Sequence, residues 1–344
     1  MSGSIDELAG LGAGAARARR SRFIDRGFRG TTLVLGIGLI ALLALLLFKL
    51  SAGAWPTFRR FGLGFFVGTE WNPVHGREVF GALPFIFGTA VTSFMAVLIA
   101  VPIAVGLALF LNQVRGSLAG PIAVFIDILA AIPSIVYGLW GLFVLKPFLD
   151  RTVEPFLADT LGKIPIIGAL FSGKSQGPDL FTAGVILAIM ILPIITAVSR
   201  EVIAVVPRDL REAALALGST RWESVRLAVL PYARSGIVGA TTLGLGRALG
   251  ETIAVSMVIG NTPQIGWSLF APGATIPSKI ASSFRDASST GLSRSALLAL
   301  AVTLVLWSFL LALISRVLVR RTEKLVGAPT VEEAAEAPAL RMTG

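Results

Sequence analysis

The chain is dominated by long apolar runs that are separated by shorter polar stretches. A helix of about 20 apolar residues crosses the ~30 Å hydrocarbon core of a bilayer. Six runs reach that length, at 31–50, 83–111, 121–148, 180–199, 235–259 and 295–318. The pattern therefore predicts an all-α integral membrane protein with six transmembrane helices.

The amino-acid composition supports a membrane protein and argues against several kinds of catalytic and metal site. Of 344 residues, 54% are hydrophobic and only 15% are charged, which is more apolar side chain than a soluble domain can cover. The absence of cysteine excludes thiolate metal ligands and cysteine nucleophiles, and the single histidine, His75, argues against a zinc site or a catalytic triad. We expect no catalytic residue, no metal site and no cofactor bound by this chain.

Basic residues at both ends of the membrane domain predict its orientation. Before the first run they are Arg17, Arg19, Arg20, Arg22, Arg26 and Arg29, and after the last they are Arg316, Arg320, Arg321 and Lys324. With an even number of spans, the positive-inside rule places both ends in the cytoplasm of a bacterial cell. The segment 200–234 is then cytoplasmic too, while 51–80, 149–179 and 260–294 lie outside.

This orientation divides the chain into three parts. The tails, 1–30 and 321–344, are predicted to be cytoplasmic and poorly ordered, and they flank a permease domain at 31–320. The first run exceeds the apolar core of a signal peptide, which favours an uncleaved anchor. The net charge of +10 serves orientation and does not predict nucleic-acid binding, because no basic stretch alternates with aromatic residues.

Proline and glycine residues lie inside several runs. Pro102, Pro133 and Pro193 predict kinks that pack against neighbouring helices, because a lipid-facing kink would leave a carbonyl unpaired. Gly246 and Gly250 are four residues apart, which predicts a face for close helix packing.

The stretch GALFSGKS at 168–175 matches a phosphate-binding P-loop pattern. A P-loop needs a strand before it and a helix after it, but here no β-branched strand precedes the motif and a turn sequence, QGPD, follows it. The motif also falls in a segment predicted to lie outside the cell, far from cytoplasmic ATP. We interpret it as a chance match that binds no nucleotide.

The segment 208–231, RDLREAALALGSTRWESVRLAVLP, is the most informative polar stretch. It predicts two short helices broken at Gly218-Ser219, with Glu212 on the first and Trp222 on the second. The pattern alone is also compatible with an amphipathic helix pair that rests on the membrane surface.

This segment resembles the coupling loop of ABC-importer permeases. The resemblance rests on Glu212-Ala213-Ala214, Gly218 and Leu230-Pro231, although Ala228 replaces a larger aliphatic residue. It implies a type I importer permease architecture with a cytoplasmic coupling-helix loop at about 200–234. In that family the loop docks on a separate ATPase subunit, so this chain would use ATP without binding it.

Three further stretches are similar to PstC-type subunits of phosphate importers. They are FGALPFI at 80–86, IPSIVYGLWG at 132–141 and GLGRALGET at 244–252. This resemblance implies a transport subunit for inorganic phosphate and not an enzyme. The implied partners are a PstA-type second permease, two PstB-type ATPase subunits and a PstS-type binding protein outside the membrane.

Arg247 and Glu251 fall inside the fifth predicted span, about one helical turn apart and on the same face. Ionisable groups at that depth cost at least ~2.5 kcal/mol each, so they normally face an interior or a watery path. A guanidinium offers forked donors that match a phosphate, although an intrahelical ion pair is the structural alternative. With the family resemblance we favour a substrate pathway at Arg247 and Glu251, and we interpret Asp127 as a helix-packing or water-facing group.

Two alternatives remain open at this point. One is an ABC permease for another oxyanion, such as molybdate or sulfate, since the binding protein makes much of that choice. The other is an ion-driven secondary transporter, but such proteins often show inverted repeats and paired broken helices, which this sequence does not reveal.

Overall fold

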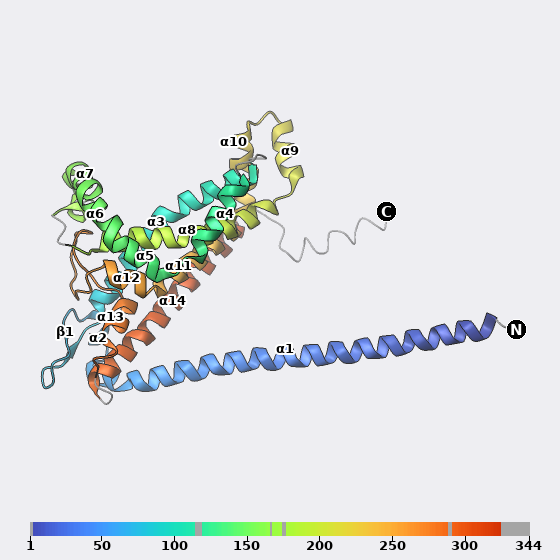
Figure 1. Cartoon of the computed structure of the whole chain (residues 1–344), viewed down its shortest axis with the longest axis horizontal. Coiled ribbons are helices and arrows are strands. Elements are labelled where there is room, and N and C mark those ends of the chain that lie inside the picture. Colours follow the sequence, from blue (N-terminus) through green and yellow to red (C-terminus); the bar gives the residue numbers. More distant parts are fainter. Residues whose placement is uncertain (1–2, 114–118, 166, 174–176, 288–290, 325–344) are drawn as a thin grey trace. The chain divides into compact units, whose positions relative to one another are not determined.

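The computed structural model describes residues 3–113, 119–165, 167–173, 177–287 and 291–324. It is almost entirely helical, and its only sheet among these residues is one short hairpin (Figure 1). The chain divides into two units, residues 1–53 and residues 54–344. The all-α membrane fold expected from the apolar pattern is confirmed.

The first unit consists of the greater part of one long helix, α1 (Gly3–Phe61). Its section Gly27–Phe61 is long and apolar enough to cross a membrane. In the segment that was expected to be a poorly ordered tail, 1–30, the backbone is helical from Gly3 onward. Alanine and arginine, which are strong helix formers, are frequent in this segment. The C-terminal tail from 325 onward lies outside the described residues.

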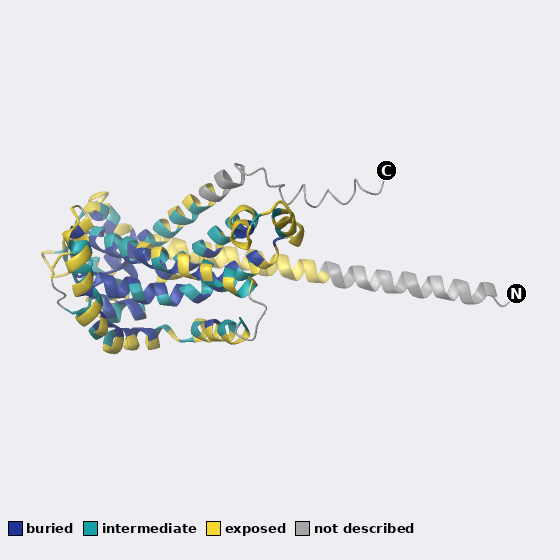
Figure 2. Cartoon of the chain, turned by 90° about the horizontal axis from the view of Figure 1, so that it is seen from above, coloured by how far each residue is buried: buried dark blue, intermediate teal, exposed yellow. Residues whose placement is uncertain are grey.

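Four long helices build the second unit together with shorter ones. They are α3 (Leu83–Gln113), α8 (Leu180–Ala204), α11 (Leu230–Gly250) and α14 (Leu292–Lys324). Pro102 and Pro193 are both accommodated inside unbroken helices. Figure 2 shows the buried residues concentrated where these helices pack together.

Small residues allow α3 and α8 to pack closely. Ala96, Ala100, Ala104 and Ala108 repeat every fourth residue along α3, and all are fully buried. Such a stripe lets helix backbones approach each other where lipid supplies no hydrophobic driving force. The two helices run in the same direction, because the start of α8 meets the first half of α3 and their last turns share one apolar cluster.

The helix α11 packs on α8 through a similar stripe, but not the predicted one. A Cβ on Gly236 would meet Val202, and one on Gly244 would meet Ile195, so α11 runs opposite to α8. A Cβ on Gly246 or Gly250 would meet nothing within the chain. Gly246 and Gly250 therefore do not provide the contact with α8, and a packing face at these two glycines stays a prediction.

Two of the six predicted spans are not continuous helices. The third breaks at Pro133 into α4 (Ala119–Ala131) and a helical stretch from Ser134 to Lys163, with a bend of 95°. The fifth ends at Gly250, and the short helix α12 (Ile253–Val258) follows. Among the described residues, four helices are long and apolar enough to span a membrane, or five if the bent pair counts as one.

The connecting segments gather at the two ends of the bundle. The helices α9 (Arg208–Ala216) and α10 (Arg221–Ser224) follow the last turn of α8. The opposite end carries the elements that remain, which are α2 (Gly64–Val67), β1 (Trp71–Asn72), β2 (Val79–Phe80), α5 (Ser134–Trp140), α6 (Lys146–Phe148), α7 (Glu154–Thr160) and α13 (Ile276–Ser283) (Figure 1).

The length of α8 separates these two ends. Its 25 residues span about 37 Å at 1.5 Å per residue. The three segments predicted to lie on one side of the membrane do meet at the end where α8 begins, and 200–234 lies at the end where α8 finishes. The two groups of segments therefore lie at opposite ends of α8, and their assignment to the outside and the cytoplasm stays a prediction.

Candidate translocation site and coupling segment

The segment 200–234 forms two helices with a sharp turn between them, as predicted. The helix α9 ends in a Schellman motif, in which the Ser219 N–H bonds to the Ala214 carbonyl and the Gly218 N–H to that of Leu215, at 3.2 and 3.0 Å. Gly218 has a φ of +89°, a left-handed conformation that favours glycine. A Cβ there would meet nothing within the chain, so backbone conformation and not crowding explains this glycine.

A capping box starts the next helix. The Thr220 hydroxyl accepts a hydrogen bond from the Glu223 N–H, and the Glu223 carboxylate accepts one from the Thr220 N–H at 2.7 Å. The Thr220 backbone and hydroxyl bonds lower the pKa of Glu223. The helix α10 then continues through a π turn at Val225–Val229 into α11, and Pro231 is accommodated in the first turn of α11.

Several side chains of this segment are exposed among the described residues. Glu212 and Ala213 are exposed and Ala214 is half-buried. Two large apolar side chains are strongly exposed, Leu217 at 89% and Trp222 at 64%. An anchored polar helix with exposed leucine and tryptophan has the composition of a docking surface for another protein. The helix α9 is attached to the end of α8, because the Arg211 guanidinium donates a hydrogen bond to the Ile203 carbonyl.

Arg247 and Glu251 lie on the two sides of a break between helices. Arg247 is in the last turn of α11 and is exposed, whereas Glu251 follows the helix and is buried. The Glu251 carboxylate accepts a hydrogen bond from the Ala254 N–H, 3.3 Å away, at the start of α12. The expectation of one continuous helical face through both residues is therefore wrong.

The two residues also do not form the intrahelical ion pair considered as an alternative. Within the described part of the chain, Arg247 has no carboxylate within 4.0 Å. Its guanidinium lies within electrostatic reach of the Tyr137 side chain on α5. Its charge is thus left available, close to a point where backbone leaves the helical pattern.

The two broken spans meet each other at this place. A Cβ on Gly138 of α5 would come within 2.9 Å of the Ala254 Cα and 2.6 Å of the Met257 sulfur, so α5 and α12 lie in close contact. Paired broken helices were not expected from the sequence, and their presence in the structure corrects that expectation. Broken helices inside a membrane are tolerated where they are buried in protein or line a path, which makes this pair the candidate translocation site.

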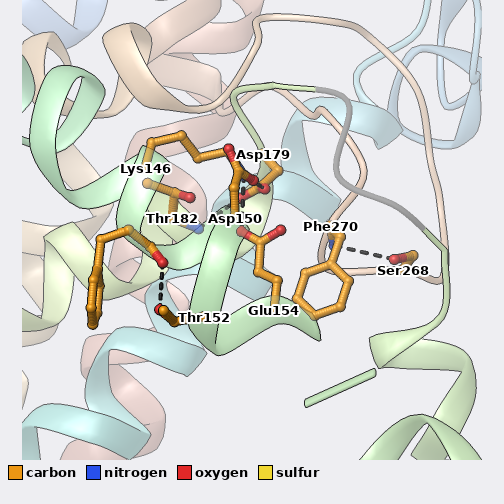
Figure 3. Close-up of polar contacts among 9 residues, drawn as sticks. Lys146, Asp150, Thr152, Glu154, Asp179, Thr182, Ser268 and Phe270 are labelled. Carbon is orange, nitrogen blue, oxygen red and sulfur yellow. Dashed lines mark hydrogen bonds and ion pairs between the residues drawn. The ribbon is translucent and has the colours of Figure 1, made fainter. Parts of the chain in front are cut away.

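A buried cluster of charges lies beyond this site, toward the end where α8 begins. The Lys146 ammonium bonds to the carboxylates of Asp150 and Glu154, at 2.7 and 2.9 Å, and also to Asp179 (Figure 3). Lys146, Glu154 and Asp179 are each less than 5% exposed. The three carboxylates are close enough together to hold a metal ion, but the ammonium of Lys146 is hydrogen-bonded among them.

This cluster fixes the half-helix α12 in place. Asp179 caps α8 by accepting from the Thr182 N–H at 2.7 Å, and its own N–H donates to the Val258 carbonyl at the end of α12. Sequence reasoning missed this cluster because it placed Lys146 at the end of the third span and the three carboxylates in the segment 149–179 that follows it. A signal was present, since Lys146, Asp150 and Glu154 are spaced four apart and therefore share one helical face.

The GALFSGKS stretch does not have the surroundings of a P-loop. Gly168 to Phe171 belong to a short 3-10 helix, Ile167–Phe171, and among the described residues the element directly before it is another 3-10 helix, Leu161–Lys163, and not a strand. Lys174 and Ser175 lie outside the described residues. Asp127, the remaining charged residue singled out in the sequence, is exposed on α4.

Residues 100–324 match the family described as "Binding-protein-dependent transport system inner membrane component". The chain is 47% identical over 305 residues to "Phosphate transport system permease protein PstC" of Pasteurella multocida, covering 88% of this chain and 94% of that protein. For the protein of the same name from Mesorhizobium japonicum the identity is 45% over 314 residues, covering 91% and 95%. A chain of the solved structure "Inward facing conformations of the MetNI methionine ABC transporter" shares 20% identity, with 70% of this chain and 96% of that chain covered and a TM-score of 0.48. The chain therefore belongs to the family of binding-protein-dependent transport system inner membrane components and, within it, to the PstC-type permeases.

Proposed function

We propose that this protein is a permease subunit of an ATP-driven importer of inorganic phosphate. The observation that carries the proposal is the 47% identity to a phosphate transport permease, which extends over 88% of the chain. The chain supplies part of the path through the membrane, and a separate subunit hydrolyses ATP.

In this function Arg247 and Glu251 line the substrate path. The Arg247 guanidinium is exposed beside the helix break and has no ion-pair partner in the described residues, so its charge and forked donors are free to meet a phosphate oxyanion. Glu251 holds the start of α12 and tempers the attraction. Weak attraction suits a pore, because tight binding would trap the substrate.

The ATPase docks on the segment 200–234. Glu212, Ala213 and Ala214 on α9, Gly218 in the turn and Pro231 at the start of α11 form the coupling element. The exposed Leu217 and Trp222 side chains beside them support this role. Two PstB-type ATPases, a PstA-type second permease and a PstS-type binding protein complete the assembly, with both chain termini in the cytoplasm of a bacterial cell.

Uptake by the reconstituted complex tests this function. The complete assembly in proteoliposomes should accumulate labelled phosphate only when ATP and the binding protein are both present. Molybdate and sulfate are the matched alternatives, each offered with its own binding protein. Accumulation of either in place of phosphate, or uptake driven by an ion gradient without ATP, would contradict the proposal.

A further inference from the structure

A pocket of about 580 Å³ lies at the end of the bundle where α8 begins. We call it the hairpin pocket, because the β1–β2 hairpin forms one wall and the helices α13 and α14 form the other. Its lining includes Trp71, Pro73 and Phe80 from the hairpin, Lys279 and Ser283 from α13, and Leu297 from α14. Its lining contains neither Arg247 nor Glu251 and no residue of α5 or α12.

Lys279 places a positive charge in this pocket. Its ammonium lies over the rings of Trp71 and Phe85, 5.5 and 5.9 Å from their centroids. In the described part of the chain no carboxylate is within ion-pairing distance of it. Burial lowers the pKa of Lys279, which is the result expected when no nearby anion offsets the loss of water.

The acidic residues of the pocket do not supply the missing partner. Glu78 accepts from the Gly76 N–H and is paired with the His75 ring, both at 3.2 Å. Asp286 is exposed at the rim and forms no ion pair within the described residues. The Lys279 ammonium therefore lies against aromatic rings in a pocket of mixed polar and apolar lining, and it has no ion-pair partner among the described residues.

We propose that the hairpin pocket receives an acidic side chain of a protein that docks on this end of the permease. The inference rests on the proposed function, in which that protein is the binding protein that delivers phosphate. One carboxylate would pair with Lys279, while the apolar remainder of the docking side chain would pack on Trp71 and Pro73. Glu78 and Asp286 in the same lining repel any anion, but they repel a phosphate dianion more strongly than a single carboxylate, so free phosphate fits less well.

Stimulation of the ATPase by the binding protein tests the inference in the complete complex. Purified phosphate-loaded binding protein is titrated onto complexes in nanodiscs, and the concentration for half-maximal stimulation is measured. Lys279→Glu should raise that concentration about tenfold or more and leave the maximal rate within about twofold, since an interface charge affects association. Lys279→Arg should stay near the wild type. Arg285→Glu is the matched control, because Arg285 is an exposed cation next to the pocket but outside its lining.

Each contrary result has a distinct meaning. An unchanged half-maximal concentration for Lys279→Glu, or an equal shift for Arg285→Glu, overturns the pocket as a docking site. Stimulation of the wild type by phosphate alone that Lys279→Glu abolishes would assign the pocket to the free anion. An effect seen only in nanodiscs with anionic lipid would assign it to the membrane surface. If the binding protein does not stimulate the wild type at all, the proposed function itself fails, and the docking site fails with it.

Discussion

Charged side chains lie in two apolar surroundings of this chain, the Lys146 cluster and the helix break at Arg247. The charges of the cluster are paired with one another, whereas Arg247 has no ion-pair partner among the described residues. In the cluster, the Lys146 ammonium is bonded to three carboxylates, of which Glu154 and Asp179 are buried and Asp150 is half-buried. At the break, Arg247 is exposed and has no ion-pair partner in the described residues. A charge that is satisfied inside the chain contributes to the fold, whereas a charge left open is available to something that comes from outside. Substitutions should therefore affect stability at the first place and transport at the second.

The largest effect should come from Arg247→Gln. Phosphate uptake should fall at least about thirtyfold, since losing a charged partner costs a desolvated anion ~2 kcal/mol or more. Labelled phosphate uptake at matched membrane levels measures this, and Arg247→Lys should keep a fraction, because it retains charge without the forked donors. The double substitution with Glu251→Gln should remain inactive. If the double variant regained transport, Arg247 and Glu251 would serve only to neutralise each other.

Lys146→Met should have its main effect on stability. It leaves buried carboxylates without their cation, which costs about 3–5 kcal/mol of the free energy of unfolding. Thermal unfolding of the purified chain measures the loss, and Lys163→Met, at an exposed lysine, is the control. A folded Lys146→Met protein with normal stability but no uptake would place the cluster on the substrate path. The cluster would then act in transport, as proposed for Arg247, and not in stability.

Gly218 extends the comparison to backbone conformation. Its left-handed φ costs a residue with a Cβ about 1–2 kcal/mol, and asparagine tolerates that conformation best. Gly218→Val should therefore impair uptake and coupled ATP hydrolysis far more than Gly218→Asn, with both variants inserted in the membrane. Equal loss in both variants would mean that the ATPase needs the space at this position, and not the turn.

The smallest effect should come from Thr220→Ala, where the interactions are satisfied but exposed. Removing this cap frays α10, so trypsin should cleave at Arg221 roughly fivefold faster, while Thr220→Ser should behave like the wild type. Because the pKa of Glu223 is lowered in the folded state, the capping box is complete above the ordinary carboxyl pKa of 4.5 and is lost as the pH falls through the lowered value. Cleavage that is insensitive to Thr220→Ala would show that docking contacts, and not the cap, hold this helix.

The sequence predicted elements best where one signal dominates. Long apolar runs predicted the spans, and Gly218 with Ser219 marked the turn between α9 and α10. Pro133 marked a break, although a kink was expected in place of a 95° bend. The break at Glu251 could not be found in this way, because it contains no proline and depends on the packing of α12 against α5. The Lys146 cluster could not be predicted for a similar reason, since Asp179 belongs to a distant part of the chain and meets Lys146 only in the folded protein.

Through the π turn at Val225–Val229, the helix that carries Trp222 continues directly into the helix that carries Arg247. Three consecutive helical segments of 4, 5 and 21 residues run from Arg221 to Gly250 without a loop between them, over about 45 Å. Beyond the end of α11, α12 is bonded to the start of α8, because the Asp179 N–H donates to the Val258 carbonyl. We therefore expect a displacement of the helix that carries Trp222 and Arg247 to be taken up between Gly250 and Ile253, where it would change the distance between Arg247 and Glu251.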